Sequence, residues 1–291
     1  MLDGVMLLWF MLTALSLIFV MWDIRSTPES PVLKWGFILV TAYTGPIGAF
    51  LYALGCREPL PGTHEQYVAA RWRQVLGSTM HCVAGDGVGI IAGAAIGSVL
   101  QLAPFADIAL EYVLGFGFGW TIFQALFMRD TAGGSYTRAL TKTFLPELLS
   151  MNGLMGGMVA VAAVSRAHVP GSTDVLSPAF WFIMSMALLA GFIVAYPVNW
   201  WLVANHLKHG MMTVRPPKAA EPVMASQADP TTGHQQQGME HMAGMEAAGA
   251  PSGHGGMAAP TVSPGAIALM TILTFVLFAV GLGVVAVFGG H

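Results

Sequence analysis

The sequence predicts an all-α polytopic membrane protein with about seven transmembrane helices, or six as the alternative. Of its 291 residues, 55% are hydrophobic and only 9% are charged, whereas about 25% of the residues in a soluble domain are charged. The apolar residues fall in blocks close to the roughly 20 residues that a helix needs to cross a bilayer. A lipid bilayer is therefore the predicted environment of the chain.

Seven apolar stretches bounded by proline, glycine or charge are the candidate spans. The fifth is the weakest, because Pro146 and Glu147 open it as a helix start, and Asn152 with several glycines lowers its hydrophobicity. Without that span the count is six. The seven stretches are residues 4–22, 34–54, 74–100, 105–128, 147–165, 178–207 and 264–288.

These stretches divide the chain into four parts. Residues 1–55 hold two N-terminal transmembrane helices, and residues 71–211 form a core of four. Residues 212–263 are rich in Pro, Gly, Ala, Gln, His and Met, a composition that cannot bury a core and predicts a disordered linker. Residues 264–291 form a C-terminal transmembrane helix. Between spans four and five, Arg138 and Lys142 lie four residues apart, which predicts a short interfacial helix within residues 129–145.

Charge and motifs exclude several classes of function. The net charge of -3 and the lack of a basic cluster argue against a nucleic-acid partner, and two cysteines cannot form a secreted-type disulfide framework. No catalytic motif is present, so no enzyme and no catalytic residue is predicted. With seven spans, most Lys and Arg residues fall on the side of the N-terminus and the linker, which places both in the cytoplasm of a multi-pass bacterial inner-membrane protein.

The third span carries a row of glycines at a four-residue repeat, which places them on one helix face. Such a row lets another helix approach closely, either within the chain or in a membrane-protein partner. The glycines are Gly77, Gly85, Gly89, Gly93 and Gly97.

The same span holds the first candidate site, at His81, Cys82 and Asp86. Cys82 and Asp86 lie four residues apart, so their side chains share a face, and His81 is adjacent. Imidazole and thiolate bind soft metals such as Cu(I), whereas Asp86, with Glu111 of the fourth span, could instead form an ion path. Alternatively, these side chains have no function in binding, and hydrogen bonds to the backbone or to neighbouring helices satisfy their polar groups.

The linker holds the second candidate metal site, in the segment from Met239 to Met245. Thioether and imidazole groups are suited to Cu(I), and a flexible chain could gather several of them. Compositional drift in an unconstrained linker is the alternative explanation. The proposed ligands are Met239, His241, Met242 and Met245.

Three motifs occur together in the core: His81-Cys82-x-x-Gly-Asp86, the stretch 114–124, and Phe180-Trp181 followed by the Tyr196-Pro197-Val198-Asn199-Trp200 ending. In this order they resemble the prokaryotic membrane family 4396 of domains of unknown function. The resemblance covers about residues 71–211 and implies a compact bundle of about four membrane helices, with no established activity.

Three functions are compatible with these features. The first is binding or handling of a soft metal, most plausibly copper. The second is a proton- or ion-coupled transporter that uses Asp86 and Glu111. The third is an assembly subunit that grips a membrane partner through its glycine faces.

Overall fold

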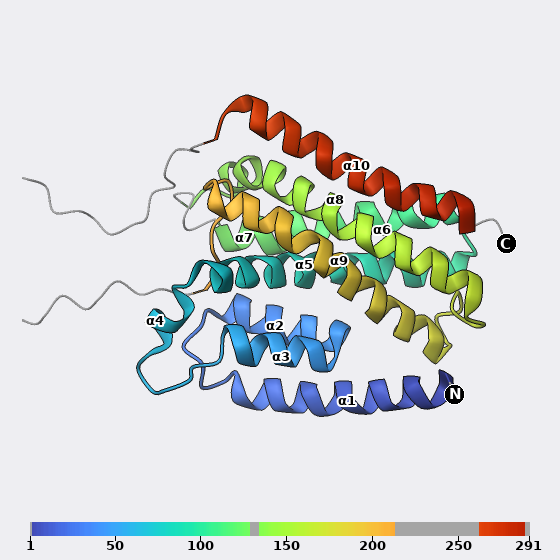
Figure 1. The fold of residues 1–291 in the computed structure, drawn as a ribbon, viewed down its shortest axis with the longest axis horizontal. Helices are drawn as coiled ribbons and strands as arrows, with labels where there is room; N and C mark the ends of the chain where they lie inside the picture. The colour runs from blue at the N-terminus through green and yellow to red at the C-terminus, as the bar shows by residue number, and fades with distance from the viewer. Residues whose placement is uncertain (1, 129–133, 213–261, 289–291) are drawn as a thin grey trace, which may run out of the picture.

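A computed structural model describes residues 2–128, 134–212 and 262–288, and every regular element in these ranges is a helix (Figure 1). Within the described residues, six segments are long and apolar enough to span a membrane. This confirms the predicted class, a membrane protein made of helices. The number of spanning helices is six, which was the alternative to the predicted seven. The six are α1 (Leu2–Asp23), α5 (Arg71–Leu100), α6 with the following turn (Pro104–Gln124), α8 (Tyr136–His168), α9 (Pro178–Ala204) and α10 (Pro264–Phe288).

The predicted second span is instead a hairpin of two short helices, α2 (Pro31–Thr44) and α3 (Pro46–Gly55). Gly45 joins them with a φ of 58°, a conformation that favours glycine, and Pro46 starts the second helix. The chain then returns to the end of α1, where Tyr52 donates a hydrogen bond of 2.8 Å to Asp23 and Arg57 lies 3.0 Å from the same carboxylate. Residues 31–55 therefore enter and leave the bundle at one end.

This hairpin changes the predicted topology. The start of α1 now lies at the same end as the C-terminal end of α10, as Figure 1 shows, and opposite the end where α4 (His64–Val68) lies. Among the described residues, Arg166 is the one cation at the end of the bundle where α1 starts. The other end, here called the basic end, holds Arg25, Lys34, Arg57, Arg71, Arg73, Arg138, Lys142 and Lys208. Cytoplasmic loops usually hold the excess of Lys and Arg. With this arrangement of helices the same rule predicts a cytoplasmic basic end and an N-terminus on the other side of the membrane, whereas the seven-span count predicted a cytoplasmic N-terminus.

Helix α8 corrects two further predictions. It runs without interruption from Tyr136 to His168, with Pro146 inside it. Ser135 caps its N-terminus, because the Ser135 Oγ accepts a hydrogen bond of 3.3 Å from the Arg138 amide. The prediction of a separate interfacial helix within residues 129–145 is therefore wrong for residues 136–145. These residues form the first turns of the spanning helix α8. Glu147, expected at a helix start, lies well inside α8 and is fully buried.

Three glycines of the α5 row, Gly89, Gly93 and Gly97, pack against α6 of the same chain, which confirms the predicted role of the row in close helix approach. A Cβ at Gly89 would overlap the carbonyl oxygen of Leu114, and one at Gly93 would lie 2.8 Å from the Glu111 Cα. Because these contacts are with backbone atoms, neither position has space for a side chain. The row is occupied within the chain and needs no partner protein.

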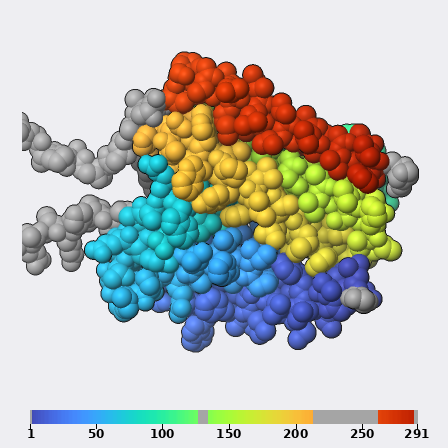
Figure 2. All heavy atoms as spheres, in the orientation of Figure 1, coloured from blue at the N-terminus to red at the C-terminus, as the bar shows by residue number. Residues whose placement is uncertain are grey.

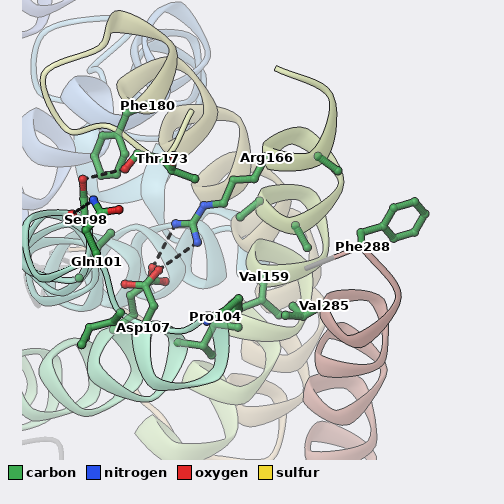
Figure 3. A pocket seen from close by; sticks show the side chains of 18 residues that line it. Ser98, Gln101, Pro104, Asp107, Val159, Arg166, Thr173, Phe180, Val285 and Phe288 are labelled. Carbon is green, nitrogen blue, oxygen red and sulfur yellow. Dashed lines mark hydrogen bonds and ion pairs between the residues drawn. The ribbon is translucent and has the colours of Figure 1, made fainter. Parts of the chain in front are cut away.

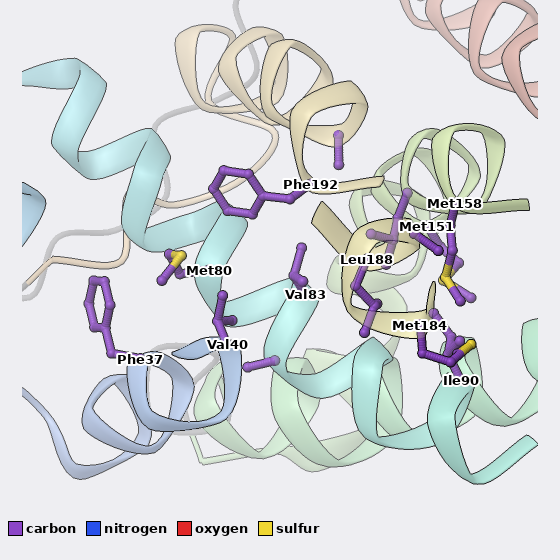
Figure 4. Packing of buried hydrophobic residues seen from close by; sticks show 14 of the residues in the cluster. Phe37, Val40, Met80, Val83, Ile90, Met151, Met158, Met184, Leu188 and Phe192 are labelled. Carbon is purple, nitrogen blue, oxygen red and sulfur yellow. The ribbon is translucent and has the colours of Figure 1, made fainter. Parts of the chain in front are cut away.

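The hydrophobic core lies where α5, α8, α9 and the α2–α3 hairpin meet. In Figure 4, Met80 of α5 lies beside the hairpin residue Phe37, and Val83 of α5 and Leu188 of α9 extend the same cluster. Helices α1 and α10 are mostly exposed and lie at opposite edges of the face seen in Figure 2. The buried centre of the bundle is therefore formed mainly by the helices between residues 71 and 204.

Candidate functional site

The site begins at an irregular turn that follows α6 (Pro104–Phe118). Residues Gly119–Gln124 form a π-helical turn, η1, before the short helix α7 (Ala125–Met128). Such turns accommodate an extra residue in a helix and are frequent at functional sites. Here the turn ends with Gln124 buried, and its Nε2 lies 2.9 Å from both the Cys82 sulfur and Glu147 Oε2.

A lysine enters the same site from the loop after α9. The Nζ of Lys208 lies 2.6 Å from the Cys82 sulfur, 2.9 Å from Asn199 Oδ1 and 3.4 Å from Glu147 Oε2. Its side chain is only 5% exposed and that of Glu147 is 0% exposed, so both charges are removed from bulk solvent. A buried charge of this kind requires a partner of opposite charge. Lys208 and Glu147 are each other's partner.

The loop that carries Lys208 is held against the start of α5. The Met211 amide donates a hydrogen bond of 3.4 Å to the Gln74 carbonyl, and Met212 fills the space beside Gly77. Burial lowers the pKa of His209 within this loop, and the neighbouring His206 and Lys142 lower it further. The lowered pKa favours the neutral form of His209, and Lys208 is the residue of this loop that reaches the Cys82 sulfur and Glu147.

Asp86 completes the site with a second carboxyl group. Asp86 and Glu147 are within hydrogen-bonding reach of one another, and both lie against Gly119, where a Cβ would overlap Asp86 Oδ1 and lie 3.1 Å from Glu147 Oε1. No donor among the described residues reaches either oxygen of Asp86 or Oε1 of Glu147. The carboxyl groups therefore face each other in a position where they can share one proton. We call Cys82, Asp86, Gln124, Glu147, Asn199 and Lys208 the central cluster.

The candidate residues predicted from the sequence separate into three places. Cys82 and Asp86 meet in the central cluster, whereas the His81 ring donates a hydrogen bond of 3.2 Å to the Phe123 carbonyl. Glu111 lies apart from both, toward the end of the bundle opposite the basic end, and 3.5 Å from Arg166. Within the ranges that the structure describes, no group of three or more His, Cys, Asp or Glu side chains could hold a metal ion. The predicted linker ligands Met239, His241, Met242 and Met245 lie outside those ranges.

A second polar site lies at the Arg166 end, around a cavity of about 240 Å³ that we call the outer cavity. Arg166 lies 3.0 Å from Asp107 and 3.5 Å from Glu111, and these three side chains line the cavity together with Ser98 and Gln101. Figure 3 shows the Arg166 guanidinium pointing from α8 to the carboxylate of Asp107 on α6. The bundle thus has two carboxyl pairs, each with a cation beside it: one in the central cluster and one at the Arg166 end.

The central cluster lies within a segment that matches a known family model. Residues 71–208 match DUF4396, a domain of unknown function. The resemblance expected from the three sequence motifs is confirmed. Searches of curated proteins and of solved structures gave no match. The DUF4396 segment holds every member of the central cluster, with Lys208 as its last residue, and also holds the side chains around Arg166.

Sequence reasoning found Asp86 but missed the other two charged residues of the central cluster, Glu147 and Lys208. The sequence predicts a helix start at Pro146 and Glu147, and Lys208 follows the last apolar residue of the sixth predicted span, 178–207. A usable signal for Glu147 is Ser150, three residues further on, because polar groups at this spacing share a helix face inside an apolar segment. Lys208 carried no such signal, since only the turn of the chain after α9 returns it to the bundle.

Proposed function

We propose that this chain is a proton-translocating transporter of the bacterial inner membrane, in which Asp86 and Glu147 carry the proton. The observation that supports it is the facing pair of fully buried carboxyl groups, near the middle of α5 and inside α8. Ionisable groups inside a membrane are costly and mark ion pathways and proton relays. The proposal corresponds to the second of the three functions expected from the sequence, with Glu147 in place of Glu111 as the partner of Asp86.

The charge balance of the central cluster favours exchange of a proton. With both carboxyl groups ionised and Lys208 protonated, the cluster has one excess negative charge in a region without bulk water. One proton shared by the carboxyl groups makes it neutral, because two like charges in contact cannot both be ionised cheaply. Loading and release of that proton change the charge of the cluster by one unit while Lys208 stays in place.

The test is proton uptake into liposomes that contain the full-length chain. A potassium diffusion potential drives protons inward, and a pH-sensitive dye inside the liposomes records them. We expect uptake above that of protein-free liposomes, and at least about a tenfold loss in Asp86→Asn and in Glu147→Gln, because a positioned proton-transfer group contributes about this much or more. Both substitutions preserve side-chain size.

The matched control is Asp3→Asn, which removes an exposed carboxyl group in the first turn of α1 and is expected to conduct like the wild type. Wild-type uptake equal to that of empty liposomes would refute proton translocation. Uptake by Asp86→Asn at the wild-type rate would refute the role of the carboxyl pair.

Copper handling is the weaker candidate. Lys208 Nζ occupies the position beside the Cys82 sulfur that a metal would need, and His81 has turned to Phe123. The remaining soft ligands are those of the 239–245 segment, so copper binding stays a prediction that rests on them. Metal analysis after copper exposure, with and without residues 239–245, tests it: equal copper contents would contradict it.

A further inference from the structure

The outer cavity has no role in the central cluster, yet it lies in line with it along α5. The cavity begins at Gly97 and Ser98 and extends to Glu111, whose backbone is level with Gly93. Gly93 follows Asp86 by seven residues, which is about 10 Å along a helix. The separation between the cavity floor and the buried carboxyl pair is therefore short.

Two polar side chains occupy this separation. The Tyr112 hydroxyl donates a hydrogen bond of 2.8 Å to Asn152 Oδ1. One turn further along α6, Gly115 packs against Asp86, because a Cβ at Gly115 would lie 3.3 Å from the Asp86 carbonyl oxygen. Asn152 is fully buried, and its Nδ2 has no acceptor among the residues that the structure describes. An orphaned buried amide is rare in proteins and indicates a site for water or another polar species.

The cavity itself is suited to water. It has room for several water molecules, and its polar lining comes from Arg166, Asp107, Glu111 and Ser98. Arg166 contacts both carboxylates and so holds Glu111 at the cavity floor. Polar groups thus continue from the Arg166 end of the bundle to the central cluster. If the ion pairs of Arg166 had only a structural role, they would need neither the cavity nor Tyr112.

We propose that the outer cavity is an aqueous vestibule through which protons reach the Asp86–Glu147 pair by way of Glu111 and Tyr112. This inference rests on the function proposed above. Glu111 takes a proton from a hydronium ion in the cavity, which remains there as water, and the carboxyl proton then passes through water to the Tyr112 oxygen. Tyr112 releases its own hydroxyl proton to Asp86, so that no charge stays on the tyrosine. Asn152 is a positioning residue that orients the hydroxyl.

Access to the cavity is tested with cysteine substitutions in the liposome system. Ser98→Cys places a thiol in the cavity lining, and Val99→Cys places one on the exposed outer face of the same helix, where Val99 is 70% exposed. A small cationic thiosulfonate is added, with the wild type as baseline because Cys56 and Cys82 are buried. We expect modification of Ser98→Cys to block proton uptake and treatment of Val99→Cys to leave it unchanged.

The relay is tested with Glu111→Gln and Tyr112→Phe, which keep the shape of each side chain. We expect each to lower uptake at least about tenfold, while Glu111→Asp retains a measurable part of it. Circular dichroism and gel filtration verify that the variants are folded.

The outcomes separate this inference from the proposed function. If Glu111→Gln and Tyr112→Phe conduct at the wild-type rate while Asp86→Asn does not, the access route is wrong and the carboxyl pair stands. Unimpaired uptake by fully modified Ser98→Cys would also overturn the vestibule. If Asp86→Asn conducts normally, the proposed function itself fails.

Discussion

Cys82 and Asp86 show how far single residues could be placed from the sequence. Their four-residue spacing predicted a shared helix face, and both reach the central cluster from α5. Their partners were not predictable in this way, because Glu147 and Lys208 are 65 and 126 residues from Cys82 along the chain. Spacing rules describe one helix, whereas the chemistry of a cluster depends on which helices pack together.

Lys208 is expected to contribute strongly to stability. Lys208→Met leaves Glu147 buried without a cation, and we expect it to lower the free energy of unfolding by about 3 kcal/mol or more. Unfolding in mixed detergent micelles measures this. Adding Glu147→Gln to Lys208→Met should restore part of the loss, because the two residues share one interaction.

Arg57→Met is the control for that measurement. Arg57 pairs with Asp23 at 3.0 Å, but its side chain is 52% exposed, so its loss is expected to cost less than about 1 kcal/mol. Equal losses in Lys208→Met and Arg57→Met would contradict the buried position of Lys208.

At the scale of elements, a residue pattern that repeats along one helix predicted that helix and its contacts correctly. Where proline or glycine interrupts an apolar stretch, the predicted helix ends were wrong. The glycine row of α5 predicted a close helix contact, and α6 provides it. Pro146 was expected to start a helix but lies inside α8, because packing on both sides of it stabilises the continuous helix. At Gly45 and Pro46 the reverse holds, since the left-handed turn there divides an apolar run that was long enough to span.

The contact between α5 and α6 is expected to fail when Gly89 gains a methyl group. A Cβ there would overlap the Leu114 carbonyl, and backbone atoms cannot move aside without separating the helices. We expect Gly89→Ala to lower the free energy of unfolding by about 1–3 kcal/mol, as overpacking does.

Gly117→Ala is the matched control, because nothing lies within 4 Å of a Cβ at that position. Alanine has the higher helix propensity, so this variant should gain up to about 1 kcal/mol. The same detergent unfolding assay applies, and a stable Gly89→Ala variant would show that the two helices are further apart than described.

At the scale of the whole molecule, the hairpin decides which ends of the chain share a side of the membrane. We expect Asp3→Cys and Leu176→Cys to react with an impermeant maleimide from one side and Leu60→Cys only from the other. All three positions are exposed, Leu176 being 88% and Leu60 65% exposed. Seven spans would instead place positions 3 and 60 together, so their joint labelling from one side would contradict the hairpin.

The central claim is that Asp86 and Glu147 share one proton inside the bundle. Infrared spectroscopy of the reconstituted protein detects it directly, because a protonated carboxyl group has a stretching band distinct from that of a carboxylate. We predict such a band at neutral pH, and its change or loss in both Asp86→Asn and Glu147→Gln but not in Asp3→Asn. A spectrum in which neither substitution alters a protonated carboxyl band would contradict the shared proton.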